Sequence, residues 1–286
     1  MLKRVAYYPG CSCEGMAIEY DQSVRALCYV LGIELVGIPD WNCCGSTPSH
    51  SYDPLLGAAL AGRNLAIAKS QGLDVVMTPC PSCLKALKTA NQVFRERPSE
   101  FLDVLGMPFS GDVRAISVLQ LLYEEIGPNL IQKAVKFPFK NKKIVPYYGC
   151  LLTRPPAFAQ FDDPENPVSM DRLIEAAGAA VPDFPHKTEC CGAALGITQR
   201  DVVMRLTGRI LEMARAVGAD AVAVACPLCQ QNLDLRQDQV NRALKENFNL
   251  PVLYITQIIG CALGIDRKTL GIEKLAVKTD ALFQSA

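Results

Sequence analysis

The sequence has little histidine, no excess of either charge and no long hydrophobic run. Lys and Arg together number 29, and so do Asp and Glu, so the chain has no net charge that would hold a polyanion such as nucleic acid. No apolar run approaches the roughly 20 residues that cross a bilayer, and the segment before Pro9 is too short for the core of a signal peptide. These absences predict a cytoplasmic protein that neither binds nucleic acid nor inserts into a membrane.

Cysteine, in contrast, is abundant. The chain has 13 cysteines, an unusual number without an export signal, because cytoplasmic thiols are kept reduced and seldom form structural disulfides. The odd number also argues against a closed set of disulfides. Metal binding or redox chemistry therefore explains their number better.

Ten of the 13 cysteines form two matching sets of five, and the second set follows the first at offsets of 139 to 147 residues. The flanking sequence repeats as well, since residues 74–83 parallel residues 220–229 and residues 115–122 resemble residues 253–260. A repeat of this length indicates two copies of one domain. The two sets are Cys11, Cys43, Cys44, Cys80 and Cys83 in the first half and Cys150, Cys190, Cys191, Cys226 and Cys229 in the second.

Within each half, short apolar runs alternate with amphipathic stretches. Strands that alternate with helices imply parallel βαβ units. The sequence thus predicts an α/β fold of two duplicated Rossmann-like or flavodoxin-like domains with parallel sheets, related by internal pseudo-symmetry. We place the domains at residues 1–140 and 141–286, with residues 97–141 as a helical linker. The expected strands are 4–8, 34–38, 74–78, 143–148 and 221–225, and the expected helices are 19–31, 54–69, 169–177 and 201–217.

The repeated cysteines follow predicted strands, at the edge of a parallel sheet where ligands usually bind. Cys80 and Cys226 each begin a Cys-Pro-x-Cys segment at the start of a helix, where free N–H groups favour thiolate over thiol. Soft thiolates select zinc, copper(I) or iron–sulfur centres, and the two histidines, His50 and His186, are too few to distinguish these metals. Five thiols per half exceed the four that a structural zinc ion or a cubane [4Fe–4S] cluster takes, and adjacent cysteines fit one tetrahedral ion poorly. A larger metal assembly is therefore favoured.

These motifs resemble those of the heterodisulfide reductase B-subunit family, whose members consist of two cysteine-rich CCG domains. The resemblance covers nearly the whole chain and rests on Cys-x31-Cys-Cys-Gly-x34-Cys-x-x-Cys in the first half and Cys-x39-Cys-Cys-Gly-x33-Cys-x-x-Cys in the second. It implies one noncubane [4Fe–4S] cluster in each half, with zinc in one half as the alternative, and a disulfide that is reduced or formed between the clusters. It also implies five cysteine ligands per cluster and no catalytic residue beyond them. The implied ligands are Cys11, Cys43, Cys44, Cys80, Cys83, Cys150, Cys190, Cys191, Cys226 and Cys229.

The resemblance further implies partner subunits, because the chain lacks the cysteine run that binds a cubane relay. Electrons would arrive through the family's cubane iron–sulfur subunit, the C type, and its flavin subunit, the A type. The substrate would be a disulfide or thiol, either a small molecule or bound to a protein, and the two Cys-Pro-x-Cys segments look closer to bacterial relatives than to methanogen enzymes. CCG proteins also occur in lactate- and glycolate-oxidising complexes, so an electron-transfer subunit of such a complex is the alternative function. A structural protein with two zinc ions is a third interpretation.

The remaining cysteines and the nearby cations are assigned by their surroundings. Cys28 and Cys261 lie in apolar helical patterns and are predicted core residues, whereas Cys13, whose counterpart is Leu152, is predicted to be a spare thiol. Trp41, the only tryptophan, is predicted to pack over the first cluster. The sequence favours Arg154 among six cations near the motifs that could hold an anionic substrate. The six are Arg63, Lys85, Arg154, Lys187, Arg200 and Arg236.

Overall fold

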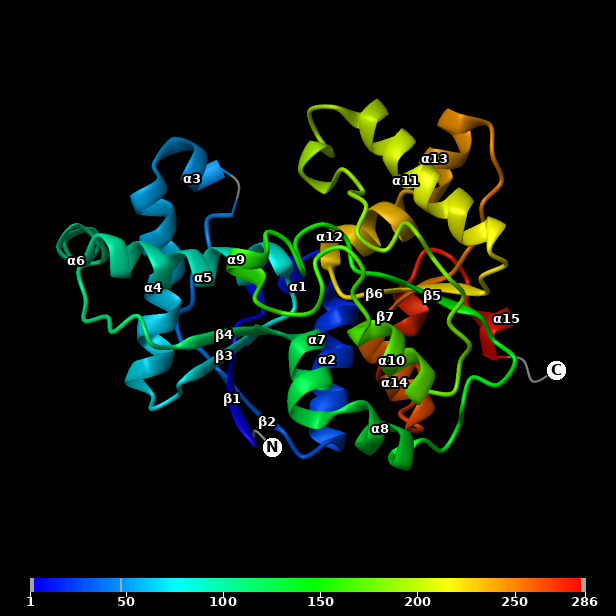
Figure 1. Ribbon diagram of the computed structural model, residues 1–286, viewed down its shortest axis with the longest axis horizontal. Helices are drawn as coiled ribbons and strands as arrows, with labels where there is room; N and C mark the ends of the chain where they lie inside the picture. The colour runs from blue at the N-terminus through cyan, green and yellow to red at the C-terminus, as the bar shows by residue number, and fades with distance from the viewer. Residues whose placement is uncertain (1–2, 47, 284–286) are drawn as a thin grey trace.

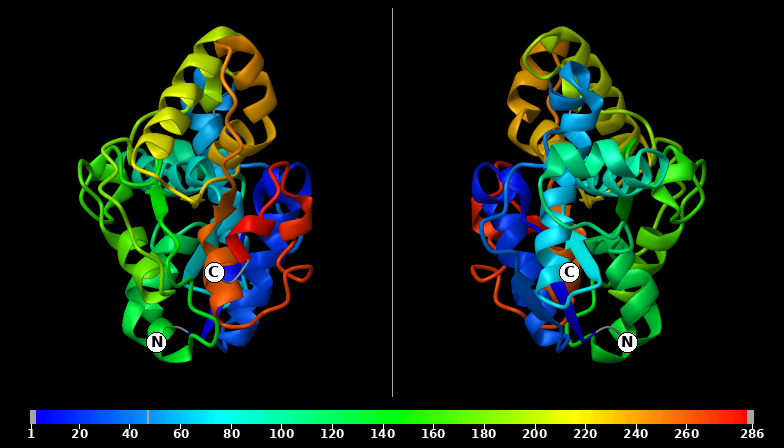
Figure 2. Two further views of the ribbon diagram at one scale, coloured as in Figure 1. Left: turned by 90° about the vertical axis from the view of Figure 1, so that its right-hand side faces the viewer. Right: turned by 90° about the vertical axis from the view of Figure 1, so that its left-hand side faces the viewer.

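The computed structural model describes residues 3–46 and 48–283, except for the side chains of residues 48, 50 and 194. Two parallel sheets lie in the middle of the molecule, and two groups of helices rise beyond them as separate arms (Figure 1). The views from either side show both arms at the same end of the molecule (Figure 2). One arm contains α3 (Pro48–Tyr52) and α4 (Pro54–Ser70), and the other contains α11 (Arg200–Ala216) and α13 (Gln237–Leu244).

The first sheet consists of four parallel strands, β1 (Arg4–Tyr7), β2 (Glu34–Gly37), β3 (Val75–Thr78) and β4 (Arg114–Ser117). They are ordered β2-β1-β3-β4, with Val5 opposite Leu35 and Met77 opposite Ile116. The inner strands β1 and β3 are mostly buried, because helices cover both faces of a parallel sheet and favour continuous apolar runs. Helix α2 (Ile18–Val30) links β1 to β2, and α5 (Pro81–Glu96) follows β3.

The second sheet consists of three parallel strands, ordered β5 (Ile144–Tyr147), β6 (Ala221–Val224) and β7 (Val252–Tyr254). Where the first half has β2, the described residues of the second half have a single bridge between Lys143 and Ala180. The same segment bonds β5 again beyond its end, where the Tyr148 N–H donates to the Lys187 carbonyl. Pro182 and Pro185 lie between these points, and proline cannot donate to a sheet. The second half therefore repeats the first without its edge strand.

The predicted α/β fold with parallel sheets is confirmed, and each predicted strand and helix lies within one residue of its observed bounds. Residues 97–141, predicted as a helical linker, also contain β4, which pairs with β3 and so belongs to the first sheet. The domain boundary at residue 140 stays a prediction. The other helical segments are α1 (Gly10–Glu14), α6 (Pro98–Leu105), α7 (Val118–Gln120), η1 (Leu121–Ile126), α8 (Pro128–Ala134), α9 (Pro156–Ala159), α10 (Ser169–Ala176), η2 (Ala193–Leu195), α12 (Pro227–Gln230), η3 (Gln231–Leu235), α14 (Ile255–Ala262), η4 (Ile272–Lys274) and α15 (Asp280–Phe283).

The two halves share one apolar core, in which α2 packs against α14. At this seam the rings of Tyr20 and Tyr254 stack with centroids 3.9 Å apart and planes 6° from parallel. Next to them the hydroxyls of Ser23 and Thr256 are 2.7 Å apart in a buried hydrogen bond. The Tyr20 hydroxyl is itself buried without a hydrogen-bond partner among the described residues. No helix in the described ranges combines the length and apolarity that a membrane crossing requires.

A buried carboxylate holds the C-terminal segment against the second half. Asp234 in η3 accepts hydrogen bonds from the backbone N–H groups of Ala276 and Val277 and from the side chain of Gln230. Burial nevertheless raises the pKa of Asp234 to about 6, because the ionised form loses more hydration than these donors replace. The Glu19 carboxyl, whose pKa burial also raises, lies across the seam.

This raised pKa predicts how stability responds to pH. The folded protein binds the proton of Asp234 more tightly than the unfolded chain, whose aspartates titrate near the usual value of about 4. Stability from this residue therefore increases as the pH falls through about 6, and between pH 7.5 and 5 we expect the wild type to gain about 1 kcal/mol over Asp234→Asn. Anaerobic urea unfolding of both proteins at these pH values measures the difference. Parallel pH profiles for the two proteins would contradict the assignment.

Candidate metal centre

The five repeated cysteines of the first half meet at the carboxyl edge of the first sheet. Cys11 lies in α1 after β1, Cys80 and Cys83 are at the start of α5 after β3, and Cys43 and Cys44 are in the loop that follows β2. The Sγ atoms of Cys44 and Cys83 are 3.3 Å apart. Further thiol contacts join Cys11 to Cys43, Cys43 to Cys44 and Cys80 to Cys83, so the five sulfur atoms form one connected group.

The second half brings its five cysteines together in the same way. The Cys150 Sγ is 3.8 Å from the Cys190 Sγ, and the Cys191 Sγ is 3.9 Å from the Cys229 Sγ. Cys226 is linked to Cys229, and the two linked subsets meet at the adjacent residues Cys190 and Cys191. All 13 cysteines of the chain are free thiols. The structure thus places the two predicted sets at equivalent positions of the two sheets.

The local electrostatics favour thiolates within each set. The hydrogen bond with Cys150 lowers the pKa of Cys190 to about 6, and the hydrogen bond with Cys83 lowers the pKa of Cys44 to about 7. The backbone N–H of Gly192 also donates to the Cys190 Sγ over 3.3 Å. The partner thiols Cys83 and Cys150 have raised pKa values, because of these same hydrogen bonds and because they are partly or wholly buried. Thiolate is the form that binds metal.

A buried tyrosine fixes the Cys-Cys loop in each half. The Tyr8 hydroxyl donates to the Asn42 carbonyl over 2.9 Å, and the Tyr147 hydroxyl donates to the Glu189 carbonyl over 2.7 Å. Asn42 and Glu189 are the residues directly before the two Cys-Cys pairs. Trp41 packs against the Tyr8 ring, with centroids 5.5 Å apart and nearly perpendicular planes, and its packing over the first cluster stays a prediction.

The glycine before the first cysteine of each set lets the backbone pass close to the sulfur atom of the last cysteine of that set. Gly10 and Gly149 both have a φ of 68°. A Cβ added to Gly10 would lie 3.0 Å from the Cys83 Sγ, and one added to Gly149 would lie 2.8 Å from the Cys229 Sγ. Both positions therefore require glycine. The Tyr and Gly residues that precede both Cys11 and Cys150 are the signal by which the sequence could have shown these roles. Tyrosines in strands usually serve packing alone, however, and the pattern does not reveal that Tyr8 and Tyr147 bond the Cys-Cys loops.

The donor sets fit a centre with several metal atoms. Among the described residues, no group of three or more His, Cys, Asp or Glu side chains is already arranged to hold a metal ion. The sulfur atoms lie instead in linked pairs, such as Cys44 with Cys83 and Cys191 with Cys229. Soft thiolate donors suit iron–sulfur centres, and a cluster of several irons takes its thiolates at different iron atoms.

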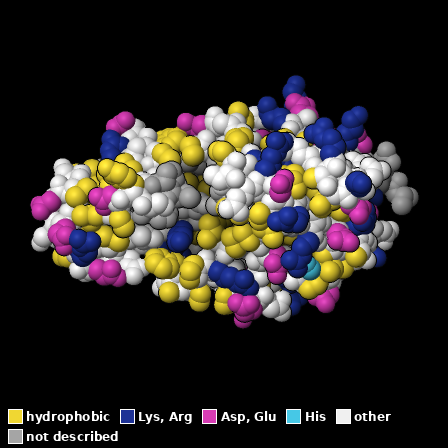
Figure 3. Space-filling model, turned by 90° about the horizontal axis from the view of Figure 1, so that it is seen from above, with side chains coloured by type: hydrophobic (Ala, Val, Ile, Leu, Met, Phe, Trp, Pro, Cys, Tyr) yellow, Lys and Arg dark blue, Asp and Glu magenta, His cyan; other side chains and the backbone are white. Residues whose placement is uncertain are grey.

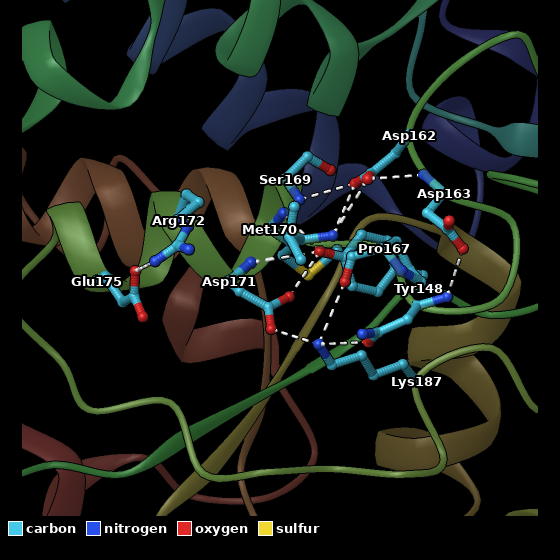
Figure 4. A network of polar contacts seen from close by, with 12 residues as sticks. Tyr148, Asp162, Asp163, Pro167, Ser169, Met170, Asp171, Arg172, Glu175 and Lys187 are labelled. Atoms are coloured by element: carbon cyan, nitrogen blue, oxygen red, sulfur yellow. Dashed lines mark hydrogen bonds and ion pairs between the residues drawn. The ribbon is translucent and has the colours of Figure 1, made fainter.

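Side-chain contacts also hold the segment that leads to Cys190 (Figure 4). Lys187 pairs with Asp171 in α10, and Asp171 accepts a hydrogen bond from the Tyr148 hydroxyl over 2.7 Å. Arg154 donates to Thr188 over 2.9 Å and to the carbonyl of Pro164 over 2.7 Å. These contacts join β5, α10 and the chain before the second Cys-Cys pair.

Most of the six candidate cations are thus engaged within the protein. Arg154, which the sequence favoured for anion binding, also pairs with Glu165 and is fully occupied in holding its own loop. Arg63 pairs with Asp40, and Lys187 with Asp171. Lys85 is the exception, because it makes no hydrogen bond or ion pair with another described residue and lines a pocket beside Cys44. The other two donate to neighbours in the second half, Arg200 to Gln239 and Arg236 to Gly196.

The cysteines outside the two sets are packing residues. Cys28 in α2 and Cys13 in α1 are buried, and Leu152, the counterpart of Cys13, is buried as well. Cys261 in α14 is partly buried against the shared core. The predicted core position of Cys28 is therefore confirmed, whereas Cys261 lies at the margin of the core. The side chain of His50, which is in α3, lies outside the described residues.

Comparison with known proteins identifies the repeated unit. A family model described as a cysteine-rich domain, CCG, matches residues 5–88 and 144–234. The chain is 34% identical to the 8-methylmenaquinol:fumarate reductase membrane anchor subunit of Wolinella succinogenes, over 95% of this chain and 96% of that protein. It is 30% identical to a protein of Archaeoglobus profundus described as like the B subunit of heterodisulfide reductase, over 92% of each chain. It is 29% identical to the B subunit of the ferredoxin:CoB-CoM heterodisulfide reductase of Methanosarcina mazei, over 97% of this chain and 95% of that one.

The fold also matches a solved structure. A hypothetical protein from Helicobacter pylori superimposes with a TM-score of 0.75 over 96% of this chain, at 14% sequence identity. The match covers 52% of that protein, so the chain spans about half its length. At this identity the likeness concerns the fold alone.

Proposed function

Since this chain belongs to the CCG cysteine-rich domain family and is homologous to the B subunit of heterodisulfide reductase over most of its length, we propose that it is the iron–sulfur subunit in which a heterodisulfide reductase-like complex reduces or forms a disulfide. The observation that carries the proposal is the pair of equivalent five-thiol groups, free of disulfides, at the edges of the two sheets. Its relatives are subunits of oxidoreductase complexes.

We assign one noncubane [4Fe–4S] cluster to each thiol group, with the ten repeated cysteines as ligands. When bound, the clusters supply one-electron transfer beside the sulfur atoms of the substrate. The protein residues hold the ligands: the lowered pKa values of Cys44 and Cys190 keep thiolates available, and Tyr8 and Tyr147 fix the loops that carry them. In the net reaction the disulfide bond accepts two electrons and two protons and yields two thiols.

The electrons must reach this chain from other proteins of the complex. The chain has no cubane-binding cysteine run, and the proposed donors are a cubane iron–sulfur protein and a flavoprotein, the C-type and A-type partners of the family. The cytoplasm is the proposed location, and similarity to bacterial rather than methanogen members stays a prediction.

A second function is favoured by two of the similar proteins. One is the fumarate reductase subunit of Wolinella succinogenes, and another is a probable glycolate oxidase iron–sulfur subunit of Bacillus subtilis, 22% identical over 82% of this chain and 50% of that protein. In such a complex the clusters would pass electrons between a flavin dehydrogenase and a quinol or quinone, and no disulfide would be cleaved.

Metal analysis and substrate reduction together test both functions. Protein purified without oxygen should contain about eight irons per chain, with matching sulfide and little zinc. The reduced protein should be reoxidised by a disulfide, with two thiols released per disulfide, and not by a menaquinone analogue. Reoxidation by the quinone alone would support the second function, and iron-poor or zinc-loaded protein would exclude both.

A further inference from the structure

A pocket of about 400 Å³ lies beside the first cysteine group and is shared by the two halves. Cys44 is the one cysteine of the first set among its described lining residues, so the pocket adjoins the thiol group and is not the space inside it. Leu151, the neighbour of Cys150, and Phe158 in α9 contribute the wall from the second half. The pocket therefore lies between the elements that carry the two cysteine groups.

Small side chains on two helices create this space. Ser82, Ala86 and Thr89 lie on one face of α5, because residues three and four positions apart share a side of a helix. Gly57 and Ala58 line it from α4. Since none of these side chains is large, the two helices leave a gap that α9 covers.

One charge faces the pocket. Lys85 is the only charged side chain among the described lining residues, and it has no partner within the described part of the chain. The nearby cations Arg63, Arg154 and Lys187 are engaged elsewhere. Seen from above, apolar side chains lie across the middle of the molecule, and Lys and Arg side chains are more numerous over the half to the right (Figure 3). The pocket is thus mostly apolar with a single available positive charge.

We propose that this pocket receives one arm of the disulfide substrate, and that this arm is an apolar chain ending in a single carboxylate that pairs with Lys85. A neutral arm would leave the Lys85 ammonium unpaired in an apolar pocket, which costs binding free energy. An arm with several negative charges would meet one cation only. The identity of the substrate class rests on the proposed function, whereas the charge preference of the pocket is independent of it.

Calorimetric titration of the anaerobically purified full chain tests the pocket without any redox step. Octanoate should bind, and its neutral match 1-octanol should bind at least about tenfold more weakly, as expected for loss of a charge-assisted hydrogen bond. Lys85→Gln should weaken octanoate binding by about the same factor and Lys85→Arg should retain it. Lys133→Gln, which removes an exposed lysine on α8, is the matched control and should change nothing. Equal binding of octanoate and octanol, or of octanoate to wild type and Lys85→Gln, would overturn the proposal.

A steric variant keeps the test independent of charge. Ala86→Leu should fill the pocket and abolish octanoate binding, whereas Ala86→Ser should leave it intact, and iron content and circular dichroism should be unchanged in both. Octanoate binding unchanged by Ala86→Leu would place the carboxylate site elsewhere and refute the proposal.

Paired substrates separate this inference from the proposed function. With 6,6′-dithiodihexanoate the KM of Lys85→Gln should rise about tenfold, while with bis(6-hydroxyhexyl) disulfide it should match the wild type. Equal KM changes for both disulfides would refute the role of Lys85 and leave disulfide reduction standing. Reduction of neither disulfide would count against the proposed function, and the octanoate titrations would then decide the pocket alone.

Discussion

Replacing Cys80 by serine should remove the iron of the first half alone, so that the protein retains about four of about eight irons per chain. Cys80 is buried directly before α5, and its sulfur belongs to the connected group of the first half. A serine hydroxyl is a hard donor that does not ionise at neutral pH and replaces a thiolate poorly. Disulfide reduction should fall to background. Anaerobic iron and sulfide analysis with visible absorption measures the loss.

The duplication supplies the matched experiment for the other half. Cys226→Ser should remove the iron of the second half and leave that of the first, because Cys226 occupies the equivalent position before α12. Cys28→Ser, which changes a buried thiol in α2 outside both sets, should keep the full iron content. Full iron in Cys80→Ser, or loss in Cys28→Ser, would contradict the ligand assignment.

Tyr20→Ala should lower the free energy of unfolding by about 3–5 kcal/mol, the usual cost of removing a fully buried aromatic ring. The ring is completely buried and stacks on Tyr254 across the seam between the halves. The cavity would open between α2 and the second half, where the backbone cannot close it without moving one half relative to the other. Anaerobic urea unfolding followed by circular dichroism measures the change.

Tyr20→Phe separates the ring from its hydroxyl. The hydroxyl is buried without a hydrogen-bond partner among the described residues, so removing it should leave stability unchanged or raise it by about 1 kcal/mol. If Tyr20→Phe proves as destabilising as Tyr20→Ala, the hydroxyl has a partner and the seam is more polar than its described contacts indicate.

Sequence patterns located most of the fold because its strands are short apolar runs that end at the repeated cysteines. The exceptions were β4 and β7, neither of which is among the predicted strands. The four residues of β4 begin with Arg114 and follow a stretch rich in proline and glycine, which is typical of a linker. The repeat held the correct signal, since residues 115–122 resemble residues 253–260, and the latter contain the end of β7 and most of α14. Local composition outweighed this signal in the prediction.

The spacing of the ten cysteines also predicted the two groups that the structure brings together. It did not indicate which of the nearby cations lacks a partner within the protein. Arg154 and Lys85 each lie a few residues from a repeated cysteine and look alike in sequence. They differ through partners that only the folded chain supplies: Arg154 meets the Pro164 carbonyl and Thr188, while Lys85 meets the open space between α4, α5 and α9. Such contacts depend on long-range folding and leave no local pattern.

The absence of a second-half counterpart to β2 among the described residues makes the two Cys-Cys loops mechanically unequal. In the first half a continuous ladder of backbone bonds along β1 and β2 leads to Cys43. In the second half the ladder is interrupted at Pro182 and Pro185, resumes where the N–H groups of Tyr148 and Gly149 bond the Lys187 carbonyl, and is supplemented by the ion pair of Lys187 with Asp171. The first loop thus follows an unbroken strand, whereas the segment before the second loop relies more on side chains, each of which a single codon can change. Mutation can therefore loosen the second centre by steps that leave the first untouched.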